Sequence, residues 1–503
     1  MSNRIDIVTN ETMALTKSAL LAKNVTVGSG LVWYDLQAPA KNLYPVITML
    51  RNSVPRVQRQ FPGDAARWKT ISSITGSGFD AMGWVPEGQR TGSMSYSAVP
   101  VVAPYVTIGE EDTVTFEAEA AAQGFEDINA TASLRVLQKT MLKEEIALLG
   151  GNATLQLGTP GAPTLSASGS GATLPTATYS VIVVCLTAEG FRNWGGTVGS
   201  VSTGAAVPLY KTITGNDGNT FTLNAGVSNK SNNTTQAITL GQTLSASLGT
   251  IPNGTVAYAW YVGTVGSEVL QSVTTINSAT FAAALVTGTQ SASAITADYS
   301  ANAGLAYDGF LTIGSKASNA AYYTSLATGT AGTGTYLTAS GRGSVIEIDN
   351  MLLAMWNNYR ITPTVIYVNA QEQKNITLKC LSNSAGPLLH YQQNDGANYK
   401  DLHASGVVRW YYNPFSVDGG FDIPIKVHPF LPPGTIMAVA ETLPAWYQNN
   451  GVEHTFAVLT RRDYYRIDWP IRTRRREFGV YCEPVLAAYA PFAIGIITNI
   501  SNG

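Results

Sequence analysis

The longest helical period in the chain lies in Leu134-Arg-Val-Leu-Gln-Lys-Thr-Met-Leu-Lys-Glu-Glu-Ile-Ala-Leu-Leu149 and stops at Gly150-Gly151. Charged side chains, Glu144 and Glu145 among them, cover most of one side and predict a solvent-facing surface. A helix over residues 126–149 would span about 35 Å. The predicted buried face consists of Leu134, Leu137, Met141 and Leu148.

Two segments that precede this helix have no evident core of their own. Residues 65–108 predict a long hairpin, because Trp68–Ile74 and Ser93–Val99 alternate in polarity around a glycine-rich connection. A two-stranded hairpin is marginal alone, so it needs a partner surface. Residues 1–60 predict an extended arm with recurring prolines and little period, which we expect to lie on another surface.

A weakly charged block follows the helix. The whole chain has 31 Lys and Arg and 33 Asp and Glu, but residues 151–300 contain only Arg192, Lys211, Lys230, Glu189, Glu268, Asp217 and Asp298. Strand patterns and the turn pairs Asp217-Gly218 and Asn253-Gly254 predict a β-sandwich, immunoglobulin- or fibronectin-like, spliced into a host domain. The predicted strands are 178–186, 255–262, 269–276 and 279–285.

The host domain resumes near residue 300 with mixed helices and strands. Ser344–Glu347 matches a capping box that opens a helix with Ile348, Leu352, Met355 and Tyr359 on one face. Asn369 is predicted to cap a second helix that ends near Leu381. The predicted strands are 364–368, 423–427, 435–440, 452–461 and 491–500.

The composition excludes several classes of protein. Charged residues make up 13% of the chain and the net charge is −2, so bulk electrostatics do not favour nucleic acid or acidic membranes. No apolar run is long enough to span a bilayer, and the N-terminus lacks the apolar segment of a secretory signal. The three cysteines, Cys185, Cys380 and Cys482, suit a reduced compartment and are expected to pack as apolar residues.

Motifs that carry chemistry are missing from the sequence. It has no Walker phosphate loop, dinucleotide fingerprint, nucleophile elbow or His-Glu-x-x-His. His390 and His403 could ligate a metal, but no spacing matches a known site, which favours ordinary surface or interface histidines. Glu110–Asp112 could bind calcium, although a solvated turn before the helix is favoured. We therefore predict no catalytic, cofactor-binding or metal-binding residues, no cofactor and no enzyme activity.

A basic cluster near the C-terminus admits two interpretations. Its arginines could contact phosphates of a nucleic acid or pair with carboxylates of another subunit, and the near-neutral chain favours pairing. The interleaved Tyr464, Tyr465 and Trp469 resemble a stacking surface, but the strand pattern favours packing. The aromatic stretch 391–415 is likewise assigned to an interface and not to a ligand. The cluster consists of Arg461, Arg462, Arg466, Arg472, Arg474, Arg475 and Arg476.

The order of these parts resembles the major capsid proteins of tailed bacteriophages, the Hong Kong 97-type fold. Residues 44–56 are similar to the N-arm of the family, and residues 67–74 with 83–88 are similar to its E-loop. Residues 134–149 are similar to its spine helix. Segments similar to its A and P domains are 352–371, 423–437 and 484–497.

The resemblance implies an α+β fold with an inserted all-β sandwich. The implied divisions are an arm at 1–64, an E-loop hairpin at 65–110, a spine helix at 111–151, an immunoglobulin-like insertion at 152–300, and the A domain with the remainder of the P domain at 301–503. The implied function is self-assembly into hexamers and pentamers of an icosahedral shell. The shell would belong to a virion made in the host cytoplasm. It would enclose double-stranded DNA and contact it non-specifically on its inner face. Implied partners are further copies, portal and scaffolding proteins, and decoration proteins, with no membrane.

Two segments that lack partners of their own fit the implied contacts between subunits. Some family members join a lysine to an asparagine between subunits, but no motif carries that chemistry over to Lys69. The predicted inter-subunit residues are Trp68, Lys69, Trp84, Glu87, Arg90, Arg56, Arg461, Arg462, Arg474, Arg475 and Arg476.

Two other classes remain as rivals. A tail or adhesin-type protein, which would bind surface carbohydrate through the sandwich, predicts β structure and repeats throughout, and the helical segments at 126–149 and 344–381 oppose it. An enzyme with an unrecognised site predicts clustered His, Asp or Glu, which the sequence does not contain.

Overall fold

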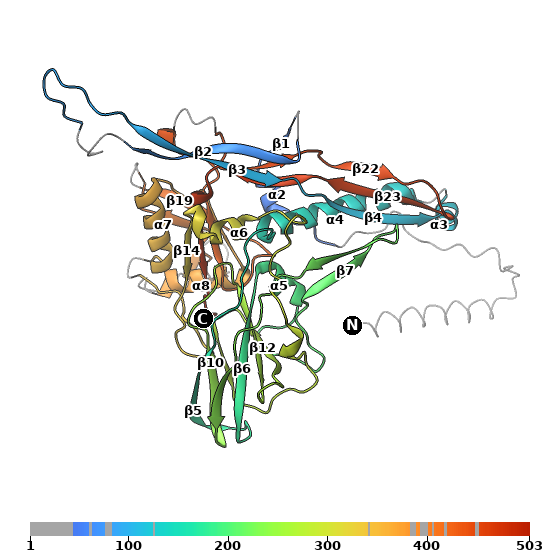
Figure 1. Cartoon of the computed structure of the whole chain (residues 1–503), viewed down its shortest axis with the longest axis vertical. Helices are drawn as coiled ribbons and strands as arrows, with labels where there is room; N and C mark the ends of the chain where they lie inside the picture. The colour runs from blue at the N-terminus through green and yellow to red at the C-terminus, as the bar shows by residue number, and fades with distance from the viewer. Residues whose placement is uncertain are drawn as a thin grey trace, which may run out of the picture.

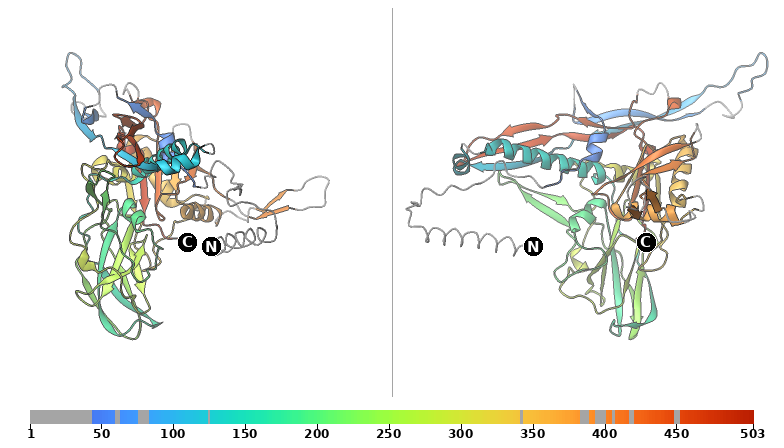
Figure 2. Two further views of the ribbon diagram at one scale, coloured as in Figure 1. Left: turned by 90° about the vertical axis from the view of Figure 1, so that its right-hand side faces the viewer. Right: turned by 180° about the vertical axis from the view of Figure 1, so that it is seen from behind.

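The computed structural model describes residues 44–59, 63–75, 83–123, 126–340, 343–382, 389–392, 401–404, 407–416, 420–447 and 452–503. The predicted arm before Tyr44 and the hairpin residues 76–82 lie outside these ranges. The chain forms an elongated unit with a projecting hairpin, a mixed central domain and a β module that extends away from both (Figures 1 and 2).

The elongated unit is a three-stranded antiparallel sheet with the long helix against one face (Figure 1). Its strands are β4 (Ile108–Thr115), β22 (Tyr465–Asp468) and β23 (Arg475–Cys482), and α3 (Phe116–Ala122) precedes the long helix α4 (Ile128–Gly150). The carboxylate of Asp127 caps α4 by accepting the backbone N–H groups of Asn129 and Ala130, both at 3.1 Å.

The long helix is confirmed, and its predicted buried face is wrong at Leu134, while Leu137 packs partly buried against the core and Met141 is half-buried. Leu148 is buried, whereas Leu134 is 55% exposed. The sheet is covered by Ala132 and Val136, which pack against Phe478 and Val480, because small and β-branched side chains let the helix approach the strands closely. Residues 110–112 form part of β4 and not a solvated turn, since β4 pairs with β23, far away in the sequence.

The central domain contains a six-stranded sheet with buried residues on both faces. Along β15, Val365 and Tyr367 join one core, and Ile366 and Val368 join the other, as the two-residue period of a strand requires. The strand order is β14 (Tyr322–Ser325), β25 (Ile494–Thr498), β20 (Ile436–Val439), β15 (Val365–Val368), β19 (Phe421–Val427) and β18 (Trp410–Asn413). The helices are α6 (Phe310–Ser315), α7 (Ile346–Tyr359) and α8 (Ala370–Ser382), and the 3-10 turns are η2 (Ala317–Asn319), η3 (Ala445–Tyr447) and η4 (Pro491–Ala493).

Both predicted helices of this domain are present, but only one cap is confirmed. Asn369 accepts the backbone N–H of Gln371 at 3.0 Å, as predicted. The capping box at 344–347 is wrong, since the side chain of Ser344 bonds to Asp349 and Glu347 accepts the backbone N–H of Thr338. The remaining host elements are α2 (Met49–Ser53), β1 (Arg56–Gln58), β21 (Phe456–Thr460), β24 (Pro484–Ala488), and the pair β16 (Leu389–Gln392) and β17 (Asp401–Ala404).

Residues 152–300 form two antiparallel sheets around an apolar core. Trp260 and Tyr258 face this core, and Tyr261 packs on the outer face of the same sheet. The sheets are β13 (Ser278–Phe281), β10 (Gly241–Ser247) and β5 (Thr164–Ala172), and β12 (Val269–Thr274), β11 (Ala257–Gly263), β6 (Ala177–Leu186) and β9 (Thr234–Ile238). Helix α5 (Ala188–Trp194), the hairpin β7 (Tyr210–Thr214) and β8 (Thr220–Asn224), and η1 (Ala292–Ala294) complete the module.

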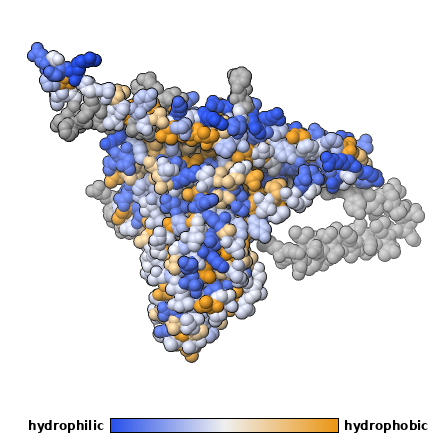
Figure 3. Space-filling view, in the orientation of Figure 1, coloured by the Kyte–Doolittle hydropathy of each residue, from blue (hydrophilic) through white to orange (hydrophobic). Residues whose placement is uncertain are grey.

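The turn at Asp217-Gly218 joins β7 and β8 as predicted, with Gly218 at φ 84°. Asn253-Gly254 is not a hairpin turn, because the strands around it belong to different sheets. The module surface is mostly pale in hydropathy, whereas hydrophilic side chains crowd the elongated unit (Figure 3). The immunoglobulin-like class and the domain boundaries stay predictions.

The module contacts its host at its neck and at several other places. At the neck, the backbone N–H of Asn302 donates to the carbonyl of Asn152 at 2.9 Å, so the two segments that connect the module to the host lie side by side. At one side, the backbone N–H of Asn277 donates to the side chain of Asn499 at 2.7 Å. At the tip of β7–β8, the amide of Asn216 donates to Glu111 at 2.8 Å. The module is therefore tethered to the host beyond its neck.

Candidate inter-subunit surfaces

The hairpin of β2 (Ala65–Thr75) and β3 (Ser95–Pro104) projects from the body (Figures 1 and 2). Every residue from Ser95 to Pro100 is exposed, so neither face of β3 has a partner there. The exposed apolar side chains include Ile71 (62%), Ile74 (66%), Tyr96 (67%) and Val102 (55%). This surface is an apolar patch that a second protein would bury favourably.

The tip of the hairpin presents three of the predicted contact residues. Trp84 is 92% exposed, and Glu87 and Arg90 are exposed beside a turn at Gly88 with φ 77°. Trp84 is the most exposed large apolar side chain in the part of the chain that the structure describes.

The root of the hairpin is anchored to its own chain. Trp68 packs edge-on against Tyr489, with ring centroids 5.5 Å apart, and Ala66 is buried. Lys69, next along β2, is exposed. Trp68 therefore fixes the hairpin to the body, and a contact of Lys69 with another subunit stays a prediction.

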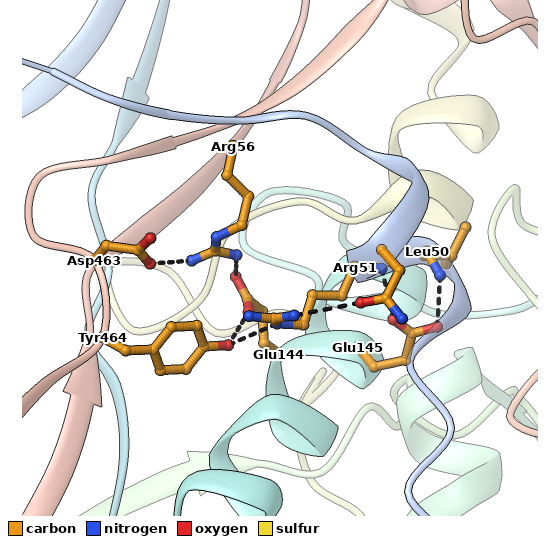
Figure 4. Close-up of polar contacts among 8 residues, drawn as sticks. Leu50, Arg51, Arg56, Glu144, Glu145, Asp463 and Tyr464 are labelled. Atoms are coloured by element: carbon orange, nitrogen blue, oxygen red, sulfur yellow. Dashed lines mark hydrogen bonds and ion pairs between the residues drawn. The ribbon is translucent and has the colours of Figure 1, made fainter.

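A buried polar cluster, which we call the arm latch, ties the end of the arm to α4 (Figure 4). Glu144, whose side chain is 0% exposed, accepts hydrogen bonds from Arg51 at 3.2 Å and from Arg56 and Tyr464. Arg56 also pairs with Asp463 at 2.5 Å. Burial disfavours the charge of Arg56, but bonding to Asp463 and attraction by Glu144 outweigh burial and raise its pKa. Its guanidinium is thus paired within the chain, without a neighbouring subunit.

The second carboxylate of the arm latch holds the start of helix α2. Glu145 accepts the backbone N–H groups of Leu50 and Arg51, both at 2.8 Å, where the helix has unpaired donors. Its Oε1 also lies 2.8 Å from Nε2 of the buried His428. The prediction that Glu144 and Glu145 face solvent is therefore wrong. Two features of the sequence could have indicated their burial: their position between Leu142 and Leu148, and the two arginines of the arm.

The basic cluster is largely neutralised inside the chain. Arg461 pairs with Glu483, and Arg475 pairs with Glu477 at 2.7 Å. Further partners are Glu117 for Arg474 at 2.7 Å, Glu119 for Arg476 at 3.0 Å and Asp468 for Arg466 at 2.6 Å. Arg462 is exposed and lies over the Tyr465 ring at 5.7 Å. The favoured carboxylate pairing occurs, but within one protomer, and contact with another subunit stays a prediction.

Sites for metals or redox chemistry are not evident in the described ranges. No group of three or more His, Cys, Asp or Glu is placed to hold a metal ion there. The backbones of His390 and His403 pair across β16–β17, but their side chains lie outside the description. The three cysteines are buried and unbonded, as predicted. No helix within the same ranges is long and apolar enough to cross a membrane.

The comparisons with known proteins give similar solved structures only. No protein-family model and no curated protein matches the sequence. The capsid of a native GTA particle is 9% identical, with 95% of this chain and 98% of that chain covered and a TM-score of 0.42. The capsid of cyanophage A-1(L) is 11% identical, with 94% and 98% covered and a TM-score of 0.42. The encapsulin SrpI of Synechococcus elongatus is 8% identical, with 95% and 96% covered and a TM-score of 0.39.

Proposed function

We propose that this chain is the self-assembling subunit of a capsid shell. The observation that carries the proposal is the β2–β3 hairpin, whose outer part has two uncovered faces in a single copy. A ribbon of two strands is marginal in water, and its exposed apolar side chains require a partner surface. Further copies of the same chain supply such a surface at every position of a closed, symmetric assembly.

The Hong Kong 97-type arrangement gives the finer form of this proposal. An arm end, hairpin, long helix and mixed domain follow one another in the order that the sequence resemblance implies. The subunits would form hexamers and pentamers of an icosahedral shell around double-stranded DNA, assembled with portal and scaffolding proteins. No residue of the described chain needs a catalytic role for this function.

The module is proposed to brace the shell subunit. Its low charge and its contacts at Asn152, Asn277 and Asn216 support a tethered element. A domain that serves mainly to bind a ligand would not need the contacts with Asn499 and Glu111. This proposal places the insert at about 152–300, as the sequence predicts.

The test of assembly is to purify the chain, alone and co-expressed with its neighbouring structural genes, and to examine it by electron microscopy and sedimentation. Closed particles of uniform size, or pentamers and hexamers, support the proposal. A chain that stays monomeric at high concentration in every preparation would refute it. Nuclease-protected DNA inside the particles tests genome enclosure.

A surface variant tests the role of the hairpin. Replacing Tyr96 and Val102 by Ser should abolish assembly or weaken it strongly while the protomer keeps its melting temperature, because both side chains are exposed in one copy. The matched control replaces Leu240 and Val265, which are 75% and 66% exposed on the module, by Ser. Equal assembly of both variants would show that the hairpin does not contact another subunit.

A further inference from the structure

A cavity of about 180 Å³ lies where α4, α5 and the neck of the module meet. Ala147 and Ile146 of α4, Val106, Leu305 and Phe430 give it mostly apolar walls. Cavities near 150 Å³ with such walls bind a benzene ring, so this one has room for a single aromatic group of about nine heavy atoms.

Two charged side chains of α5 line the same cavity without a mutual bond. Within the described residues, neither Glu189 nor Arg192 has a hydrogen bond or a close ion pair. The guanidinium of Arg192 lies over the Phe430 ring, at 5.5 Å, and is attracted by Glu189 and Tyr44 at longer range. Lys143, at the rim, is already paired with Glu110 at 2.5 Å. A carboxylate without a hydrogen-bond donor, beside a guanidinium, would suit an aromatic ring that carries one N–H donor.

We propose that this cavity receives the indole of Trp84 from a second copy of the chain, an inference that rests on the proposed self-assembly. The indole N–H would donate to Glu189, and Arg192 would lie between the indole and Phe430. Trp84 is 92% exposed. The hairpin carries it away from α4 and α5 of its own chain (Figures 1 and 2), so the donor of the ring is another copy.

The electrostatics of Glu189 support this chemistry. Burial raises its pKa to about 7, although the charge of Arg192 opposes the shift. The other ionisable groups that line the cavity are Lys143, paired with Glu110, and Tyr307. As the pH rises through 7, Glu189 loses its proton and becomes a stronger acceptor for the indole N–H. Docking should therefore strengthen over this pH range.

The protomer alone allows the first test, with indole as the probe. Binding measured by calorimetry or by ligand-observed NMR should weaken about tenfold for 1-methylindole, which lacks the donor, and by a similar factor for Glu189→Gln. Ala147→Leu should fill the cavity and abolish binding, whereas Ala130→Leu, the same change at an exposed position of α4, should not. Equal binding of both indoles, or no binding of indole, would overturn the assignment.

Assembled particles allow the second test. Trp84→Cys combined with Ala147→Cys should give disulfide-linked multimers on oxidation, and Trp84→Cys with Ala130→Cys should not, since the native cysteines are buried. Particles without cross-links would overturn the cavity assignment and leave the proposed function standing. Failure of the unaltered chain to assemble would instead overturn the proposed function. If only the cysteine variants fail to assemble, the indole measurements decide.

Discussion

Glu144→Gln tests whether the arm latch holds the arm on the body. Glu144 is fully buried and accepts bonds from Arg51, Arg56 and Tyr464. The amide keeps the shape but removes the charge, so two partly buried guanidinium groups lose their shared counter-ion. Removing one partner of a buried ion pair costs about 3–5 kcal/mol. We expect this cost to appear mainly as local release of the arm, because the rest of each core is untouched.

Limited trypsin digestion measures this release. Arg51 and Arg56 are cleavage sites that the arm latch holds closed, and cleavage follows the open population when opening is fast. A loss of 3 kcal/mol corresponds to roughly 100-fold faster cleavage. The matched control is Glu110→Gln, whose pair with Lys143 is partly exposed at 31% and 43% and contributes about 0–1 kcal/mol. Acceleration below about tenfold in Glu144→Gln, or equal acceleration in both variants, would refute the reasoning.

Three further predictions concern single side chains. The pKa of Glu189 is raised from 4.5 to about 7 in the folded chain, so the fold prefers the protonated form and loses stability as the pH rises between these values. Glu189→Gln should therefore raise the free energy of unfolding by up to about 3 kcal/mol at pH 8 and leave it unchanged at pH 4. A difference between variant and wild type that is the same at both pH values would contradict this. Arg474→Ala should change the free energy of unfolding by less than about 1 kcal/mol, because its pair with Glu117 is 82% and 59% exposed; a larger loss in urea titration would show a role beyond this pair. Asn216→Ala should leave the melting temperature nearly unchanged but speed hydrogen exchange in β7 and β8. The control Asn219→Ala, at the same turn, should leave the contact with Glu111 intact. Equal exchange rates in wild type and Asn216→Ala would argue against the brace.

Local patterns predicted the elements whose environment is set by nearby residues. The apolar run at 364–368 and the Asn369 cap were predictable because one strand and one turn contain the whole signal. The module strand at 178–186 was predictable for the same reason, since its continuous apolar run indicates two buried faces. These predictions needed no knowledge of what each strand pairs with.

Contacts between distant segments explain the errors. β4 was predicted as a turn and helix, because its pairing partner β23 follows more than 350 residues later in the sequence. Glu144 and Glu145 were placed in solvent because charged helix residues usually lie there. Their burial depends on arginines and backbone donors of the arm, which no helical period can report. The candidate surface on the hairpin was predictable, since it follows from the absence of a partner nearby.

The arm latch also has a consequence for synthesis of the chain. Arg56 and Asp463 are 407 positions apart in the sequence. At a translation rate of about 5–20 residues per second, roughly 20–80 s pass between the appearance of the arm and that of its last partner. Until Asp463 and Tyr464 emerge, Arg56 has no second anchor and Glu144 lacks one donor. The arm thus closes fully on its own body only after Tyr464 has emerged, and a shorter nascent chain on the ribosome does not present the closed form to other copies.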